Sequence, residues 1–305
     1  MKGNIFDFMR YRNIAAIFSI VLILVALTSV ISRGLNLGID FTGGVVVEAG
    51  FSEEINLQSL RVLLAEADYA NAMVQNFGSP TDVLIRLEPQ EEMDGGVIRD
   101  AILAVMSEVE SSVELRRVEF VGPQVGQDLI EQGSLAMLFA LIMIFIYVTF
   151  RFRWKFALGA IGALIHDVLI LVGLFSILQM NFDLTILAAV LATIGYSLND
   201  TIVVFDRVRE NFKALRGEAA YDVINKSISQ MITRTMITSG TTLLVLLALF
   251  YLGGETVSGF ALALIVGIVI GTYSSIFVAS SLIIYLQITS LDFAERKREA
   301  VDDLP

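Results

Sequence analysis

Two ionisable residues in apolar segments have the types and spacing needed for proton transfer inside a membrane. Asp200 lies in the run GYSLNDTIVVFDRVREN (195–211), and on a helix Thr193, Ser197, Asp200 and Arg207 would share one polar face. Because hydrocarbon penalises an ionised carboxylate, we expect Asp200 to face protein or water and to change its protonation state. The alternative is a carboxylate that only holds two helices together.

Arg234 offers a positive charge for the same site. It begins another apolar segment, in which Thr238 and Thr241 follow on one helical face. A buried guanidinium could pair with the Asp200 carboxylate, and protonation of that carboxylate would break the pair. From spacing alone, an arginine that merely anchors its helix at the membrane surface is an equally good interpretation.

Three further polar residues in membrane segments are candidates for a proton relay or for helix packing. His166, the single histidine of the chain, precedes Asp167 near the middle of a third apolar segment, and Asn199 precedes Asp200. A histidine–aspartate pair can relay protons near neutral pH, but such a pair more often links neighbouring helices through hydrogen bonds.

Asp167 and Asp200 on consecutive segments also raise the possibility of an intramembrane aspartyl protease, in which two carboxyl groups share a proton. Here the sequence contexts are His-Asp and Leu-Asn-Asp, whereas such proteases carry Tyr-Asp and Gly-x-Gly-Asp. We therefore assign no catalytic residue and expect that the protein is not an enzyme.

The composition is that of an integral membrane protein, since 55% of the 305 residues are hydrophobic. The absence of cysteine excludes disulfides and thiolate metal sites. Six apolar runs are long enough to cross about 30 Å of hydrocarbon as helices, and the first is interpreted as a retained anchor. They are residues 13–32, 133–150, 156–178, 184–206, 234–252 and 257–287.

Basic residues beside these runs predict the orientation of the chain. With six spans they all lie on one side, which the positive-inside rule assigns to the cytoplasm. The N-terminus (1–12), a loop or helix (207–233) and the C-terminal tail (288–305) are then cytoplasmic. The basic clusters are Lys2/Arg10/Arg12, Arg151/Arg153/Lys155, Arg207/Arg209/Lys213/Arg216 and Arg296/Lys297/Arg298.

Residues 36–127 are expected to form an extracytoplasmic domain between the first two helices. The segment has 16 acidic and 5 basic residues, which argues against nucleic-acid binding. Its pattern predicts a βαββαβ order, typical of a ferredoxin-like α+β sandwich. The predicted elements are strand 45–51, helix 56–67, strands 71–77 and 83–87 around a Gly-Ser-Pro turn, helix 95–109 and strand 113–121.

A glycine-dense segment follows the first predicted helix. It contains Gly38, Asp40, Gly43 and Gly44 but lacks the spacing and the following helix of a phosphate-binding loop. We interpret it as a hinge between membrane and domain. Neither a nucleotide nor a metal site is predicted.

Five motifs together resemble a known family. They are Asp7-Phe8-Met9-Arg10, GIDFTGG (38–44), ALIHDV (163–168), SLNDTIVVFDRVREN (197–211), and Thr233-Arg234-Thr235 with Thr238-Ser239. In this order they resemble the SecF family, the membrane subunits of the accessory complex of the bacterial Sec translocase. The resemblance covers essentially the whole chain.

The resemblance implies a protein of the resistance–nodulation–division superfamily in the bacterial cytoplasmic (inner) membrane. Such a chain forms half of a pseudo-symmetric twelve-helix unit with SecD, and the proton-motive force drives late export of unfolded preproteins through SecYEG, with YajC as a further partner. In that family the positions matched by Asp200 and Arg234 are implicated in proton transfer. Protons are then the coupling ion, and no cofactor is implied.

Two other functions compete with this one. A purely structural stabiliser of the translocase would use its membrane charges only for packing, and a neutral isostere of Asp200 would then be tolerated. The second alternative is that the chain forms half of a proton-coupled exporter of small molecules or lipids. Such pumps usually have two large insertions in one long chain.

Overall fold

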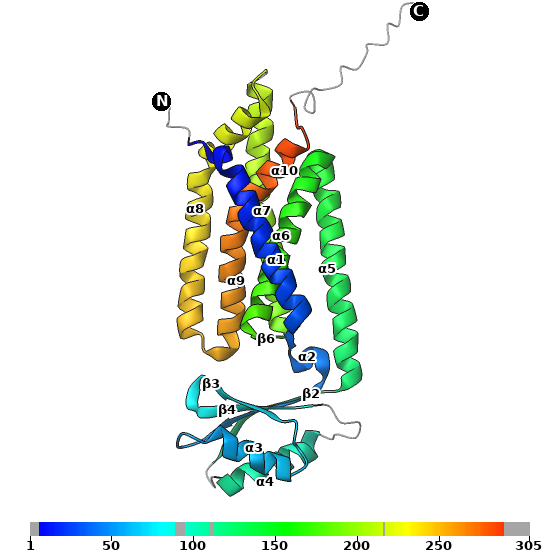
Figure 1. Cartoon of the computed structure of the whole chain (residues 1–305), viewed down its shortest axis with the longest axis vertical. Helices are drawn as coiled ribbons and strands as arrows, with labels where there is room; N and C mark the ends of the chain where they lie inside the picture. The colour runs from blue at the N-terminus through cyan, green and yellow to red at the C-terminus, as the bar shows by residue number, and fades with distance from the viewer. Residues whose placement is uncertain (1–5, 89–94, 110–112, 216, 290–305) are drawn as a thin grey trace, which may run out of the picture.

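The computed structural model of the chain describes residues 6–88, 95–109, 113–215 and 217–289. A bundle of long helices carries a small α/β domain at one end (Figure 1). Helix α5 flanks the bundle on one side and α8 on the other, while α1 crosses its face.

Six helical segments of the described chain are long and apolar enough to cross a membrane, which confirms the predicted number. Even α9, the shortest of the long helices, has 20 residues, which is about 30 Å at 1.5 Å per residue. The segments are α1 (Arg12–Arg33, preceded by the 3₁₀ turn η1, Phe8–Tyr11), α5 (Pro123–Arg151), α6 (Trp154–Leu178), α7 (Leu184–Ala214), α8 (Ala220–Leu252), and α9 (Glu255–Ser274) continued by the π-helix η2 (Ser275–Ala279) and α10 (Ser280–Tyr285).

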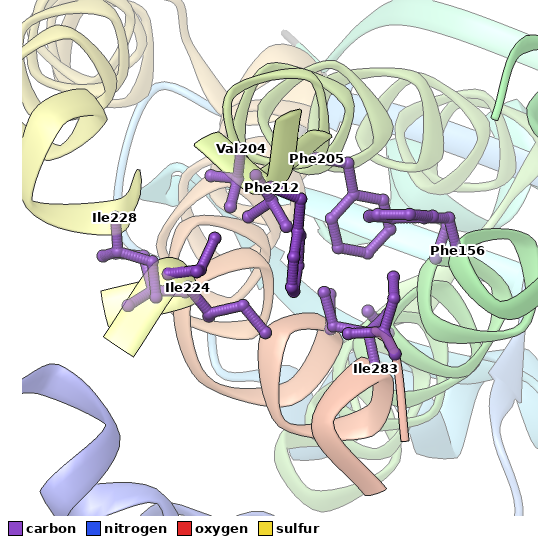
Figure 2. Packing of buried hydrophobic residues seen from close by; sticks show 14 of the residues in the cluster. Phe156, Val204, Phe205, Phe212, Ile224, Ile228 and Ile283 are labelled. Atoms are coloured by element: carbon purple, nitrogen blue, oxygen red, sulfur yellow. The ribbon is translucent and has the colours of Figure 1, made fainter. Parts of the chain in front are cut away.

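Helices α7 and α8 extend well beyond the predicted spans. The segment 207–233 contains the end of α7 and the first turns of α8. Apolar side chains continue at helical spacing there, so that Phe212 packs against Ile224 in a buried cluster with Phe156 and Phe205 (Figure 2). Asn211 Nδ2 also donates to Ser227 Oγ at 2.8 Å, which joins the two extensions.

The domain after α1 has the predicted order of elements. They are β2 (Gly44–Gly50), α3 (Leu57–Glu66), β3 (Met73–Phe77), β4 (Ser79–Leu87), α4 (Gly95–Val109) and β5 (Glu114–Val121). The strands form one antiparallel sheet in the order β3-β4-β2-β5, and both helices lie on the sheet face turned away from the bundle (Figure 1).

The helix cap predicted in this domain is present, whereas the predicted turn differs from the structure. Asn56 caps α3, since its side chain accepts from the backbone N–H groups of Gln58 and Ser59. The predicted Gly-Ser-Pro turn is shorter, because Gly78 alone has a positive φ of 78° and β4 begins at Ser79. Pro80 can enter the strand because it lies at its beginning.

A short parallel pairing ties the domain side of α1 to the beginning of α7. β1 (Asn36–Leu37) pairs with β6 (Asn181–Phe182). The four-residue helix α2 (Ile39–Thr42) follows β1 and packs against α5. The glycine-dense segment is therefore held between two membrane helices.

Candidate functional site

Asp200 lies inside the bundle, where α7, α8 and α9 meet. Its side chain is 3% exposed. The Oδ2 atom lies 3.5 Å from Ser239 Oγ on α8 and 3.4 Å from Thr272 Oγ1 on α9, both at the outer limit of hydrogen bonding. These two hydroxyls are 2.9 Å apart and bond each other more closely than either bonds the carboxyl group.

Arg234 is on α8, five residues before Ser239, but it does not form the ion pair that the sequence suggested. Its side chain is exposed, and no ion pair within 4.0 Å joins it to Asp200. Ser239, which lies 3.5 Å from Asp200 Oδ2, is on the same helix as Arg234. The two residues therefore share a region without touching.

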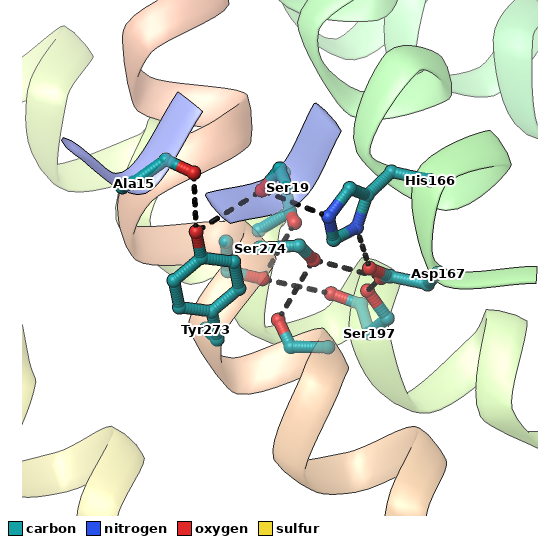
Figure 3. Close-up of polar contacts among 10 residues, drawn as sticks. Ala15, Ser19, His166, Asp167, Ser197, Tyr273 and Ser274 are labelled. Atoms are coloured by element: carbon teal, nitrogen blue, oxygen red, sulfur yellow. Dashed lines mark hydrogen bonds and ion pairs between the residues drawn. The ribbon is translucent and has the colours of Figure 1, made fainter. Parts of the chain in front are cut away.

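His166 and Asp167 belong to a second buried cluster (Figure 3). His166 Nδ1 is 2.8 Å from Asp167 Oδ1, and the side chains are 3% and 2% exposed. The other oxygen, Oδ2, accepts from Ser197 Oγ at 2.6 Å and from Ser274 Oγ at 2.7 Å. His166 Nε2 lies 3.0 Å from Ser19 Oγ on α1.

The two aspartates thus differ in how well they are hydrogen-bonded. Asp167 has three contacts of 2.6 to 2.8 Å from α6, α7 and α9. Asp200 has two contacts of 3.4 and 3.5 Å among the described residues. A buried carboxylate is stabilised chiefly by close donors, so Asp200 is the one whose ionised form is poorly satisfied.

Close packing of α9 on α7 brings the two clusters together. Gly267 lies against Thr193, and Gly271 lies against Ser197, so closely that added Cβ atoms would meet their side chains at 2.3 and 2.9 Å. The polar face predicted on α7 therefore meets the Gly-x-x-x-Gly motif of α9. Arg207, at the far end of that face, instead donates to Gln230 and Glu210.

The last span changes its helical winding next to these clusters. Residues Ser275–Ala279 form a π-helix directly after α9, and Ser280 Oγ donates to the Ser275 carbonyl. Ser275 Oγ is 2.8 Å from Thr201 Oγ1, beside Asp200 on α7. Such turns are frequent at functional sites, and the apolar pattern of 257–287 gave no sign of one.

The glycine-dense segment supplies a cap for α7. Asp40 Oδ2 accepts from the Leu184 N–H at 2.9 Å, and Asp183 Oδ1 accepts from the Ile186 N–H at 2.9 Å. Two carboxylates thus lie at the positive end of the helix that carries Asp200. Burial raises the pKa of Asp183, and the nearby charge of Asp40 contributes in the same direction.

The glycines of this segment make close turns, as their spacing suggested. Gly43 and Gly44 have φ values of 71° and 120°. A Cβ on Gly38 would lie 3.0 Å from the Asp183 Cβ. Hinge motion at Gly38, Asp40, Gly43 and Gly44 stays a prediction.

Sequence reasoning missed several polar residues of the clusters, and it included one candidate that the structure places outside them. Asn199 is exposed on α7 and belongs to neither cluster. Thr272, Tyr273 and Ser274 all take part in the clusters, and the signal that could have found them is the hydroxyl run GTYSS after the Gly-x-x-x-Gly motif.

In the described part of the chain, His, Asp and Glu side chains form no group of three that could hold a metal ion. A cavity of about 480 Å³ between α5, α6 and the β1–β6 junction is lined by apolar side chains such as Leu37, Phe41, Met137 and Val172.

Comparison with known proteins identifies the family. Residues 101–289 match the family described as "Protein export membrane protein SecD/SecF, C-terminal", and residues 28–55 match the "SecD/SecF GG Motif". The protein translocase subunit SecF of Vibrio alginolyticus is 49% identical over 282 residues, 92% of this chain and 90% of that protein. The subunit of the same name from Pseudomonas aeruginosa is 46% identical over 306 residues, covering 100% and 99%.

Solved structures agree with the sequence relatives. The crystal structure of SecDF, a translocon-associated membrane protein from Thermus, superposes with a TM-score of 0.83 at 36% identity over 92% of this chain. A SecDF structure in the super-membrane-facing form gives a TM-score of 0.70 over 94%. This chain spans 38% of the first SecDF chain and 39% of the second. The chain therefore belongs to the SecF family of multi-pass protein translocase subunits.

Proposed function

We propose that this chain is a proton-motive-force-driven subunit that, with SecD, assists late export of preproteins through the SecYEG channel, with YajC as a further partner. The observation that carries the proposal is Asp200, a buried membrane carboxyl group with only two distant hydroxyl donors among the described residues. A group in that environment exchanges a proton more readily than one that is fully hydrogen-bonded.

Protonation of Asp200 would change the contacts between three helices. The carboxyl group meets α8 through Ser239 and α9 through Thr272. A proton from the side of the sheet domain would neutralise the carboxylate, remove its attraction to Arg234 and turn it into a hydrogen-bond donor. We propose that the resulting shift of α7, α8 and α9 moves the domain and the emerging preprotein outward.

The energy available is sufficient for such a shift. One elementary charge crossing 100 mV delivers about 2.3 kcal/mol, enough to change a two-state equilibrium by tens-fold. Protons are then the coupling ion, and the proposal includes neither a cofactor nor an enzymatic reaction.

Exposed polar residues support SecD as the partner. Arg234, Thr238, Thr241 and Asn199 face outward from membrane helices. Thr238 and Thr241 donate to carbonyls of their own helix, but the Arg234 guanidinium and the Asn199 amide must meet protein or water, because lipid offers them no hydrogen bonds. A second protein half against α7 and α8 would cover them, and the solved SecDF chains are long enough to supply one.

The proposal includes a cytoplasmic location for both termini and a periplasmic ferredoxin-like domain. The beginning of α1, the end of α5 and the beginning of α6 lie at the bundle end opposite the sheet (Figure 1). These helix ends carry Arg12, Arg151 and Lys155, which supports the orientation. The βαββαβ order and the antiparallel strand order β3-β4-β2-β5 support the ferredoxin-like assignment.

The test is proton-driven preprotein export by vesicles that contain SecD and either this chain or its Asp200→Asn variant. Asparagine keeps the shape and the contacts with Ser239 and Thr272 but does not titrate, so we expect the proton-dependent increment to disappear. The matched control is Asp206→Asn on the same helix, where the carboxylate is exposed and pairs with Arg151.

Equal membrane levels of all three proteins must be established first. If Asp200→Asn retains the full proton-dependent response, the proton-carrier assignment is wrong and the chain is a structural stabiliser of the translocase. Proton-coupled transport of a lipid or small molecule without an effect on export would instead support the exporter.

A further inference from the structure

We propose that His166 and Asp167 form a fixed ion pair in which both ring nitrogens of His166 carry a proton, and that this pair positions Asp200 instead of relaying its proton. The first part rests on hydrogen-bond geometry alone. The second part, positioning, rests on the proposed function.

The hydrogen bonds that lead to the His166 ring begin at Tyr273 on α9. Its hydroxyl group lies 2.8 Å from the Ala15 carbonyl oxygen and 3.0 Å from Ser19 Oγ. A carbonyl oxygen only accepts, so the single phenolic proton goes to Ala15. The contact with Ser19 then requires the serine proton, which Ser19 donates to the Tyr273 oxygen.

Ser19 therefore has no proton left for His166. The distance from Ser19 Oγ to His166 Nε2 is 3.0 Å, and in this arrangement the nitrogen must be the donor. The chain of contacts from Ala15 through Tyr273 and Ser19 to the imidazole ring can be followed in Figure 3. Nε2 thus carries a proton.

The second nitrogen faces an ionised carboxylate. Ser197 Oγ and Ser274 Oγ donate to Asp167 Oδ2 at 2.6 and 2.7 Å, distances typical of O–H groups that donate to a charged oxygen. The Gly271 carbonyl oxygen, 3.1 Å from Ser274 Oγ, is the more distant acceptor for the single Ser274 proton. With Asp167 ionised, its Oδ1 accepts from Nδ1–H at 2.8 Å. His166 is then an imidazolium, and the pair has no net charge.

A neutral pair suits this location. Among the described residues that surround the ring, the titratable side chains are Asp167 beside it on α6 and Tyr273 on α9, whose ring centre is 6.1 Å away. From α1 the ring meets Ser19, and from α7 the carboxylate meets Ser197. A buried charge needs a partner and saturated hydrogen bonds, and this pair has both.

The pair fixes the helices that hold Asp200. Ser197 lies three residues before Asp200 on α7, and Ser274 lies two residues after Thr272 on α9. Both bind the same oxygen of Asp167. His166 and Asp167 thereby fix the relative position of α7 and α9, and with it the long contact of 3.4 Å between Thr272 and Asp200. We name them positioning residues.

The test of the protonation state uses the fact that His166 is the only histidine in the chain. The full chain is expressed with ¹⁵N-histidine and no histidine tag, reconstituted in lipid nanodiscs, and examined by solid-state NMR at pH 7.5. We expect two protonated ring nitrogens, unchanged in the Asp200→Asn variant. One unprotonated ring nitrogen in the wild-type chain overturns the proposal, whatever the export assay gives.

Tyr273→Phe checks the origin of the Nε2 proton. Without the phenol, Ser19 loses the acceptor of its own proton, and we expect the Nε2 signal of His166 to change. Tyr285→Phe is the control, because Tyr285 lies in α10 and contacts Asn13 outside the cluster. An unchanged spectrum of Tyr273→Phe contradicts the counting argument.

Positioning is tested by the pH profile of proton-driven export. Ser274→Ala removes one hydroxyl from Asp167, and we expect the midpoint of the profile to move by roughly half a pH unit or more. The control Ser176→Ala removes an equally buried serine of α6 that bonds Ser29 and the Gly34 carbonyl, and it leaves the midpoint unchanged. A midpoint that stays fixed in Ser274→Ala overturns the positioning role, whereas a wild-type chain without any proton-driven export contradicts the proposed function instead.

Discussion

The buried aspartates Asp167 and Asp200, on the neighbouring helices α6 and α7, have different surroundings. Asp167 is closed in by donors from several helices, while Asp200 has only the distant hydroxyls of Ser239 and Thr272 among the described residues. The same residue type is therefore suited to two roles, one holding helices together and the other exchanging a proton.

At the start of α7, Asp183 gives a prediction for the pH dependence of stability. Burial raises its pKa in the folded protein above the ordinary value of 3.8, so the folded state binds the proton more tightly. Its contribution to stability is then greatest at low pH and is lost as the pH rises through the folded-state pKa. Asp183→Asn keeps an N-cap but does not titrate.

We therefore expect Asp183→Asn to gain stability relative to the wild-type chain as the pH is raised from about 4 toward 7. Thermal unfolding of both proteins in detergent, over this pH range, measures the difference. Asp40→Asn should weaken the dependence, because the Asp40 charge contributes to the shift. A difference in Tm that stays constant with pH contradicts the prediction.

At the scale of elements, the contact between α7 and α9 depends on glycine. Gly267 leaves room for Thr193, and Gly271 leaves room for Ser197. Without these two glycines α9 would stand farther from α7, and its Thr272 hydroxyl would lie too far away to reach Asp200 on α7.

Gly267→Ala should accordingly destabilise the protein. Its methyl group would lie 2.3 Å from Thr193 Oγ1, and overpacking of this kind costs about 1–3 kcal/mol. Gly195→Ala on α7 is the control, since a Cβ there meets nothing within 4 Å and alanine favours the helix. Thermal unfolding in detergent compares them; equal stability of the two variants would mean that α9 can move away at little cost.

The exposed face of α8 leads to a prediction about the partner. A photo-crosslinking amino acid at Val245, which is 68% exposed and on the same face as Thr238 and Thr241, should form an adduct with SecD in membranes. At Ile17 of α1, which is 64% exposed on a purely apolar helix face, we expect adducts with lipid instead. Absence of a SecD adduct from Val245, with the complex intact, would place the partner elsewhere.

For the whole molecule, the absence of cysteine makes orientation directly measurable. Gln58→Cys in the sheet domain should react with a membrane-impermeant maleimide in intact spheroplasts. Glu218→Cys, between α7 and α8, should react only after permeabilisation. Both side chains are exposed, so unequal accessibility in the folded protein does not explain the difference. The reverse pattern would invert the proposed topology.

The elements that depend on local physics follow from the order of residues along the chain. Long apolar runs specify six spans because backbone groups in lipid must bond within a helix, and the alternation of apolar residues specifies the order of the extramembrane elements. The face shared by Thr193, Ser197 and Asp200 was also predictable, since helical periodicity fixes it.

Which polar groups meet depends on how the helices pack against one another. Asp40 caps a helix 144 residues away, and Ser19 reaches a histidine 147 residues away. Arg234 turned out to face outward, without the expected ion pair to Asp200 in this chain. Such contacts depend on helix rotation and separation, which are set by packing between helices such as that of Gly271 on Ser197, and no local pattern records them.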